Sequence, residues 1–317
     1  MALDLQQQSA QHDHRRHHTR YETENGCVVL QAGPIENGGI TRIRSYAATL
    51  WIDGVAVRST IIITLIEVIR RHMGGCMRED QTLETYMPPP HPRGVELSGQ
   101  LVRLEPLDVG KHSEDLFHAN SLDRDGSNWT YLPYGPFSTL ENYQTWLTEA
   151  ASTPDPYFFA IIKRASNKAV GLASYLRIKP EVGSIEVGHI NYSPLLQQTR
   201  EGTEAMFLLM KWAFESGYRR YEWKCNALNT KSRNAAQRLG LSYEGVFRQM
   251  SISKGRNRNT VWFAAIDKEW PTLKTSFETY LAGDNFNADG RAKQSLSGLT
   301  KPLLYKHDTL EFGFAQV

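Results

Sequence analysis

Apolar and polar positions follow regular patterns from about residue 97 to residue 266. We expect strands where apolar residues alternate or form short runs, and helices where they recur every three or four positions. The predicted strands cover 97–107, 157–163, 169–178, 184–192, 221–225, 245–253 and 260–266, and the predicted helices cover 109–119, 138–150, 203–216 and 231–239. Strands mixed with helices in this order predict an α/β domain.

Two local signals support these elements. Ser138, with Glu141 three residues later, forms a predicted capping box that opens the second helix. Along the strand at 221–225, apolar side chains alternate with charged ones, which predicts a strand with one buried face formed by Tyr221, Trp223 and Cys225.

The N-terminal part lacks this order. Residues 1–87 show no clear periodicity apart from the apolar run STIIITLIEVI at 59–69. That run is about half of the ~20 apolar residues that a spanning helix needs, so we interpret it as a buried or self-associating segment. The run MPPPHPRG at 87–94 is a stiff, helix-breaking linker. The predicted organisation is a largely disordered or poorly structured extension at 1–87, a domain at 88–300 and a C-terminal tail at 301–317.

The composition excludes several classes of function. The chain has 317 residues with 36 Lys and Arg against 34 Asp and Glu, and this near balance argues against nucleic-acid binding, which needs a basic face. Three cysteines, none in a CxxC pair, provide neither a disulfide framework nor a zinc site. The first twenty residues lack the apolar region of a secretory signal. We therefore expect a cytoplasmic monomer or homodimer without nucleic-acid or membrane partners.

A histidine cluster near the N-terminus is the one candidate for metal binding. Imidazole suits zinc, copper or nickel, but no predicted helix or strand fixes the spacing of His12, His14, His17 and His18. We expect a solvated tail here and no metal site.

The informative junction is the strand at 184–192 followed by a loop and the helix at 203–216. Free N–H groups and the helix dipole make such a helix start an anion site. Gly202 and Thr203 lie where the backbone would approach a phosphate, and Arg200 could add a charge. Taken alone, the pattern also fits an ordinary strand-to-helix loop.

Three segments of the chain resemble a known family. They are IEVGHINYSP at 185–194, QQTREGTEAM at 197–206 and YEWKCNALNTKSRNAAQRLGLSYEG at 221–245. Residues 97–300 resemble the GCN5-related N-acetyltransferases (GNAT), and in particular their RimJ/RimL-like branch. The resemblance implies a GNAT fold, with a mixed, mostly antiparallel central sheet flanked by helices. It also implies an acyltransferase that moves an acetyl group from acetyl-CoA, its co-substrate, to a primary amine.

The resemblance also implies a cofactor site with separate roles. Strand residues offer N–H groups to the thioester carbonyl, the loop seats the pyrophosphate, Asn229 binds the pantetheine arm, and Ser232 donates a proton to the departing sulfur. The implied cofactor-binding residues are Ile190, Asn191, Tyr192, Gln197, Gln198, Thr199, Arg200, Glu201, Gly202, Thr203, Asn229 and Ser232. Two positions depart from the family pattern: Arg200 replaces the first loop glycine, and Ala236 stands where many relatives carry a tyrosine.

Glu186 is the candidate general base. It lies four residues before Ile190, so the sequence predicts that the two side chains share a face, and burial would raise its pKa. Alternatively, Glu186 pairs with Arg177 across the sheet and has no catalytic role. His189 is predicted on the opposite face as a packed histidine, and Ser232 could be only a hydrogen-bonding residue at a helix start.

The acceptor and the alternative function stay open at this point. The acceptor could be a protein N-terminus or a small-molecule amine, and the aromatic, acidic loop at 123–137 would suit a cationic amine through cation–π contact. The basic turn KGRNRN at 254–259 is a solvated hairpin tip, or it recruits an acidic substrate or the 3′-phosphate of CoA. The alternative to an enzyme is a non-catalytic acyl-CoA sensor or scaffold.

Overall fold

The chain forms two compact units, residues 1–85 and 86–317. The structure, a computed structural model, describes residues 18–23, 26–31, 49–52, 55–58, 83 and 85–310. In the first unit, β1 (His18–Thr23) pairs antiparallel with β2 (Gly26–Gln31), and β3 (Thr49–Ile52) pairs antiparallel with β4 (Val55–Arg58).

These two hairpins fall within the segment for which the sequence predicts little structure. Their strands are four to six residues long, and they were not predicted from the sequence. The apolar run at 59–69 and the histidines at 12, 14 and 17 lie outside the described residues.

The second unit holds the remaining elements. Its strands are β5 (Leu97–Ser98), β6 (Val102–Pro106), β7 (Tyr157–Lys163), β8 (Lys168–Lys179), β9 (Ser184–Tyr192), β10 (Arg220–Asn226), β11 (Ser242–Ser253) and β12 (Arg256–Ile266). Its α-helices are α2 (Val109–Asn120), α3 (Leu140–Ala151), α4 (Arg200–Glu215), α5 (Thr230–Arg238), α6 (Trp270–Leu281) and α7 (Leu296–Thr300). Short 3₁₀ helices are η1 (Ser127–Trp129), η2 (Pro180–Val182), η3 (Gly283–Asn285) and η4 (Lys301–Leu303).

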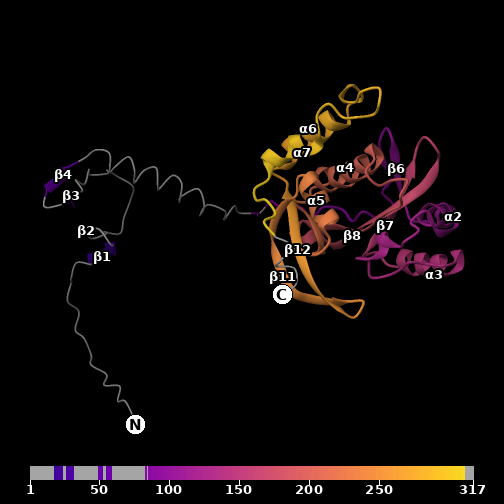
Figure 1. The fold of residues 1–317 in the computed structure, drawn as a ribbon, viewed down its shortest axis with the longest axis horizontal. Helices are drawn as coiled ribbons and strands as arrows, with labels where there is room; N and C mark the ends of the chain where they lie inside the picture. The colour runs from indigo at the N-terminus through magenta and orange to yellow at the C-terminus, as the bar shows by residue number, and fades with distance from the viewer. Residues whose placement is uncertain are drawn as a thin grey trace, which may run out of the picture. The chain divides into compact units, whose positions relative to one another are not determined.

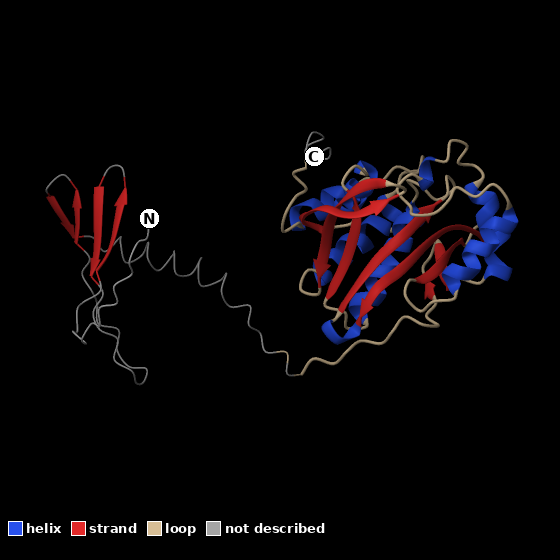
Figure 2. Ribbon diagram, turned by 90° about the horizontal axis from the view of Figure 1, so that it is seen from below, coloured by secondary structure: helices blue, strands red, loops and turns tan. Residues whose placement is uncertain are grey.

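All eight strands of the second unit form one sheet. Their order is β11-β12-β10-β9-β8-β7-β6-β5, and each neighbouring pair is antiparallel except β9 and β10, which are parallel. Figure 1 and Figure 2 show helices on both sides of this sheet. The mixed, mostly antiparallel sheet flanked by helices confirms the predicted fold class.

Each face of the sheet has its own apolar core. On one face, α4 packs with α6 and with inward side chains of the central strands such as Val187 and Trp223. On the other face, Leu116 of α2 and Leu147 of α3 pack against Leu172 of β8. Strand β10 alternates buried and partly exposed positions along its length, as its sequence predicts. We call the two sides the α4 face and the α2/α3 face.

Two predicted boundaries are wrong for local reasons. The cap of α3 is Thr139, whose side chain accepts the N–H of Asn142, and not Ser138. The basic segment at 254–259 is predicted as a turn but is mostly strand. Strand β11 ends at Ser253 and strand β12 begins at Arg256, so only Lys254 and Gly255 lie between them.

The strand predicted at 97–107 is two short strands joined by a turn. The turn is held by Glu204 of α4, whose carboxylate accepts the N–H groups of Gln100, Leu101 and Val102 at 2.9, 2.7 and 2.8 Å. Glu204 is 5% exposed. These three hydrogen bonds satisfy a buried charge, and they tie the start of α4 to the first strands of the sheet.

Residues 301–310, which the sequence assigns to a tail, are attached to the domain. Asp308 makes two hydrogen bonds to the buried Arg233 of α5, at 2.7 and 2.9 Å. The Arg233 guanidinium also donates to the carbonyl oxygens of Ala227 and Leu310. The backbone joins the attachment where the N–H of Tyr243 donates to the carbonyl oxygen of residue 306. The segment therefore supports the start of α5.

Replacing Asp308 with alanine is expected to lower the free energy of unfolding by about 3 kcal/mol, because a buried guanidinium would lose its carboxylate partner. Urea unfolding measures the change. Asp289→Ala is the matched control, because Asp289 and Arg291 form an exposed pair at 3.4 Å, and such pairs add little. An Asp308 variant as stable as the control would contradict a structural role for this attachment.

Candidate active site

A gap opens between the two parallel strands in the middle of the sheet. Strands β9 and β10 pair only from Ser184 with Arg220 to Val187 with Trp223. Beyond these pairs, β9 continues to Tyr192 and β10 to Asn226 without pairing to each other. Main-chain groups on the facing edges of the two strands are therefore available to a ligand.

A β-bulge in β9 lies at the start of this gap. Gly188 pairs with Ser174 and Asn191 pairs with Leu172, so two residues of β9, His189 and Ile190, lie opposite one residue of β8. His189 has a φ of 49°, in the left-handed region that non-glycine residues rarely adopt.

The bulge corrects two predictions about faces. Ile190 packs with the core on the α4 face, whereas Glu186 pairs with Leu176, which points to the same side as Ser174 and Leu172. Glu186 and Ile190 therefore lie on opposite faces. His189 contacts Phe158 and Tyr134, on the α2/α3 face with Glu186. The sequence prediction counted strict alternation, which an inserted residue reverses.

Main-chain directions beyond the bulge follow from one hydrogen bond and from the alternation of a strand. The N–H of Ser193 donates to Val170 of β8, so the main chain of Tyr192 faces the opposite edge, toward the gap, and so does that of Ile190. The main chain of Asn191 faces β8. Its side chain is 1% exposed, and its amide atoms have no hydrogen-bond partner among the described residues.

The loop before α4 leaves donors free. Thr199 caps the helix, and its hydroxyl oxygen accepts the N–H of Gly202 at 3.0 Å. The N–H groups of Gln198, Thr199 and Arg200 donate to no protein atom among the described residues. Gln198 has a φ of 57° and Thr199 is extended, and successive N–H groups in such a turn can form a concave anion site. The free donors at a helix N-terminus fit a diphosphate.

The side chains of the same segment have other contacts. Arg200 donates to the carbonyl oxygen of Leu281 at 3.0 Å, and its guanidinium lies 3.7 Å from the ring centroid of Phe286. Arg200 is therefore held against the end of α6, which accommodates an arginine at the loop position where the family has glycine. Glu201 forms an ion pair with Lys163 at 2.9 Å.

Two further loop residues serve packing. Thr203 is 3% exposed, and its hydroxyl oxygen accepts a hydrogen bond from Arg238 at 3.1 Å. Its N–H donates to the carbonyl oxygen of Thr199, and the approach of its backbone to a phosphate stays a prediction. A Cβ on Gly202 would lie 2.8 Å from the carbonyl oxygen of Leu196 and 2.9 Å from the ring of Tyr192. Gly202 is thus required by the close packing of α4 on the loop.

Asn229 and Ser232 lie at the start of α5, beside the end of β10. Asn229 is the N-cap, and its side-chain oxygen accepts the N–H of Ser232 at 3.1 Å. The indole N–H of Trp223 donates to the Ser232 hydroxyl oxygen at 3.0 Å. Ser232 therefore accepts one hydrogen bond, and its own proton can be donated; a hydrogen bond between Ser232 and the Cys225 thiol opposes the effect of burial on the Cys225 pKa. Burial raises the pKa of the nearby Cys225 thiol to about 11, so this thiol is not a nucleophile near neutral pH.

Glu186 belongs to a network of ion pairs on the α2/α3 face. Its carboxylate lies 2.8 Å from Arg177 and 2.7 Å from Lys224. Lys224 also contacts Glu222 at 2.7 Å and lies 3.7 Å from the ring centroid of Trp262. Burial raises the pKa of Glu186, and the hydrogen bond and charge of Lys224 oppose this, as does Arg177. The predicted alternative partner, Arg177, is thus present.

The loop at 123–137 reaches both sides of the gap. On the β9 side, the Asn128 amide donates to the carbonyl oxygen of Tyr192 at 3.2 Å. On the β10 side, the Tyr131 hydroxyl donates to the carbonyl oxygen of Leu228 at 3.1 Å. Gln197 of the anion loop also donates to the Tyr192 carbonyl oxygen, at 2.9 Å. The sequence indicates an aromatic loop but not this position, which depends on contacts distant in sequence.

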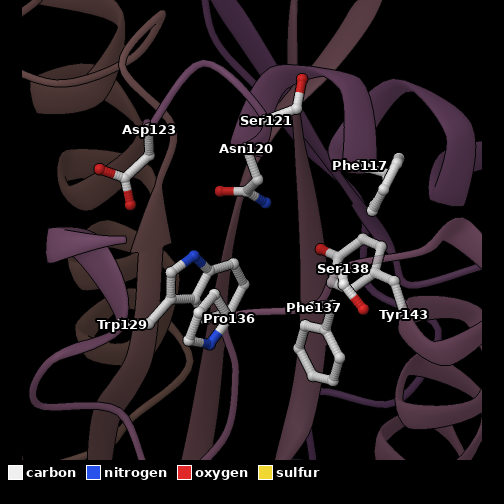
Figure 3. Close-up of a pocket in the computed structure, with 9 residues that line it drawn as sticks. All are labelled: Phe117, Asn120, Ser121, Asp123, Trp129, Pro136, Phe137, Ser138 and Tyr143. Carbon is white, nitrogen blue, oxygen red and sulfur yellow. The ribbon is translucent and has the colours of Figure 1, made fainter. Parts of the chain in front are cut away.

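A cavity of about 160 Å³ lies between α2, this loop and α3 (Figure 3). The amide of Asn120, which is 7% exposed, has no hydrogen-bond partner among the described residues. None of the predicted site residues lines the cavity. Its lining residues are Phe117, Asn120, Ser121, Asp123, Trp129, Pro136, Phe137, Ser138 and Tyr143.

His189 connects the loop to the bulge. Its Nδ1 is hydrogen-bonded to the Tyr134 hydroxyl at 3.1 Å, and the two rings stack with centroids 5.7 Å apart. Burial lowers the pKa of His189 to about 4, and the charges of Arg177 and Arg258 lower it further while Asp155 opposes them. The imidazole is therefore neutral near pH 7, as expected for a packed histidine.

We expect the free energy of unfolding to fall as the pH is lowered from about 6.5 to 4, by up to about 3 kcal/mol from His189. In that window, the unfolded chain takes up a proton on this imidazole and the folded chain does not. Urea unfolding between pH 7 and pH 4 measures the slope. His189→Gln should flatten it, and an unchanged slope in this variant would show that other groups cause the acid sensitivity.

Known proteins with a similar sequence or fold indicate the family of this chain. The sequence model named "Acetyltransferase (GNAT) domain" matches residues 102–242, which include β9, the anion loop, the gap and the start of α5. A solved GCN5-related N-acetyltransferase from Brucella melitensis is 42% identical, covering 69% of this chain and 100% of that chain, with a TM-score of 0.68.

A second solved structure agrees. A probable acetyltransferase of the GNAT family from Chromobacterium violaceum is 38% identical, covering 61% of this chain and 96% of that chain, with a TM-score of 0.57. No curated protein matches the sequence. The chain belongs to the GCN5-related N-acetyltransferase family.

The described residues contain neither a membrane-spanning helix nor a group of side chains typical of a metal site. None of their helices is long and apolar enough to cross a membrane. They also hold no group of three or more His, Cys, Asp or Glu side chains arranged to bind a metal ion.

Proposed function

We propose that this protein is an N-acetyltransferase that moves an acetyl group from acetyl-CoA to a primary amine. The single observation that carries the proposal is the bulged gap between β9 and β10, beside the free N–H groups before α4. If the N–H groups of 198–200 bind the diphosphate of an elongated cofactor, the rest of that cofactor can lie along the gap. Acetyl-CoA supplies an acetyl group activated as a thioester.

The protein's own groups divide the work of the transfer. The N–H groups of Ile190 and Tyr192 face the gap and donate to the thioester carbonyl oxygen, where negative charge develops. Asn229 lies on the other side of the gap and contacts the pantetheine arm. Ser232 donates to the departing sulfur, in place of its hydrogen bond to the Cys225 thiol. The buried amide of Asn191, on the strand that borders the gap, is a further polar group, and among the described residues it has no hydrogen-bond partner.

Glu186 would take the proton that the attacking ammonium must lose, directly or through water. Support comes from its position on the α2/α3 face, which the loop at 123–137 also covers, and from the effect of burial on its pKa. The ion pairs with Arg177 and Lys224 favour the ionised carboxylate, which is the form that accepts a proton. Glu186→Gln should therefore lower kcat more at pH 7 than at pH 9, where more of the amine is already neutral.

The acceptor is a protein N-terminus or a small-molecule amine, and the RimJ/RimL-like branch remains our assignment from the sequence motifs. Cytoplasmic location, the absence of nucleic-acid and membrane partners, and a monomeric or homodimeric state also remain predictions. The presence of Ser232 beside the end of β10, and of Glu186 in β9 just before the gap begins, favours an enzyme over a non-catalytic acyl-CoA sensor.

Release of the CoA thiol, measured with acetyl-CoA and a panel of primary amines and peptides, tests the proposal. We expect turnover that depends on the amine. Saturable binding of acetyl-CoA without turnover on any acceptor would support the sensor instead.

A further inference from the structure

The β11–β12 hairpin carries basic side chains on the α2/α3 face. Trp262 contacts Lys224 on this face, and Phe247 stacks on Trp262 with centroids 4.5 Å apart. Because side chains two residues apart share a face of a strand, Arg258 and Arg256 of β12 lie on the same side as Trp262. That side is the one where Glu186, His189 and the loop at 123–137 lie.

Acidic groups near the gap on this face already have partners. Glu186 pairs with Arg177 and Lys224, and Glu222 pairs with Lys224 and Arg220. By contrast, no ion pair of Arg256 or Arg258 occurs within residues 85–310. The segment 245–262 holds Arg248, Lys254, Arg256 and Arg258 and no Asp or Glu. The hairpin therefore has an uncompensated positive charge.

The hairpin is held near the gap. The Lys254 ammonium donates to the carbonyl oxygen of Trp129 at 2.9 Å and contacts that of Gly135 at 3.4 Å, so the hairpin tip is fixed to the loop that bridges the gap. Arg258 is close enough to His189, at the bulge, to contribute to its lowered pKa. Figure 1 shows the hairpin projecting beyond the other strands of the sheet.

We propose that the acceptor amine carries an anionic group, a carboxylate or a phosphate, and that Arg258, with Arg256 beside it, binds that group while the amine lies at the gap. A guanidinium matches both anions through paired hydrogen bonds. The inference rests on the proposed function and adds the acceptor's charge to it. It assigns the basic hairpin to the acceptor and not to the 3′-phosphate of CoA, because Lys254 holds the hairpin tip to the loop at 123–137.

Acetylation by the full chain is compared for acceptor pairs that share an amine and differ in the anion. The pairs are phosphoethanolamine with ethanolamine, phenylalanine with phenylethylamine, and the C-terminally amidated peptide Ser-Glu-Glu with the amidated Ser-Gln-Gln. In at least one pair, the anionic member should have a kcat/KM at least about tenfold higher, as expected for a charged hydrogen bond. The pair that responds identifies the source of the anion.

Three variants complete the test. Arg258→Gln should lower kcat/KM for the anionic member about tenfold more than for its neutral partner, and Arg258→Lys should restore part of the difference. Arg291→Gln is the matched control, because the Arg291 side chain is 85% exposed. It should leave kcat/KM unchanged for both members of each pair. Two results would overturn this inference and leave the proposed function intact. One is acetylation of amines with no preference for the anionic member of any pair. The other is an equal loss of kcat/KM for both members in Arg258→Gln. No acetylation of any acceptor would instead contradict the proposed function, and the inference with it.

Discussion

Replacing Ser232 with alanine is expected to lower kcat by roughly 10²–10³-fold, the range found when an enzyme loses one acid or one oxyanion donor. The Trp223 indole N–H already occupies one acceptor position on this hydroxyl, so the hydroxyl proton is oriented away from Trp223. The resemblance of the sequence motifs predicts Ser232 as the nearest replacement for a tyrosine at the position of Ala236. Steady-state kinetics with acetyl-CoA and an accepted amine measure the change.

The same substitution has a structural effect that must be separated from catalysis. Trp223 would lose its acceptor, so we expect a modest fall in the free energy of unfolding, about 1 kcal/mol. Ser276→Ala is the matched control, because Ser276 is a buried helical serine whose hydroxyl donates to Thr272 in α6. If Ser232→Ala keeps its kcat while both variants unfold alike, Ser232 is only a structural residue at the start of α5.

Replacing Gly202 with valine is expected to weaken the binding of acetyl-CoA, because the loop before α4 would change position. Any Cβ at this position meets the Leu196 carbonyl oxygen and the Tyr192 ring below 3.0 Å, so α4 and the loop must separate. The N–H groups of 198–200 would then lose their common direction. We expect at least a tenfold weaker Kd and a loss of about 1–3 kcal/mol in stability, typical of overpacking.

Gly283→Val is the control for this experiment. Gly283 has an ordinary φ, and no atom lies within 4 Å of its Cβ position, so its variant should bind the cofactor and unfold like the parent protein. Calorimetry and thermal unfolding give the two readouts. A Gly202 variant that binds acetyl-CoA normally would show that the anion loop does not depend on this close packing.

Local signals in the sequence were sufficient for much of the fold. Strand β10 alternates as its residues predict, and α4 and α5 lie within a few residues of their predicted bounds. Helix α4 begins at Arg200, three residues earlier than predicted, because Thr199 supplies a cap. These features depend on neighbours along the chain, so periodicity and capping residues predict them.

The remaining features depend on contacts between distant segments. The bulge at His189 inserts a residue opposite β8, and no residue type in β9 signals it, so the predicted faces of His189 and Ile190 were reversed. The turn before β6 is held by Glu204, about one hundred positions later, and the start of α5 is held by Asp308. The sequence motifs predict Arg200 as a departure from the family loop, but its partner, Leu281, could not be predicted from sequence.

Titration of acetyl-CoA into the full chain, followed by calorimetry and by thermal unfolding, tests the central claim most directly. If free N–H groups before α4 hold the diphosphate beside the gap, binding is saturable at one site per chain, with a Kd in the range of about 1 μM to 1 mM usual for enzyme substrates. The midpoint of unfolding should rise with ligand concentration, because only the folded protein binds. Neither heat nor a shift of the midpoint at millimolar acetyl-CoA would contradict this account of the site.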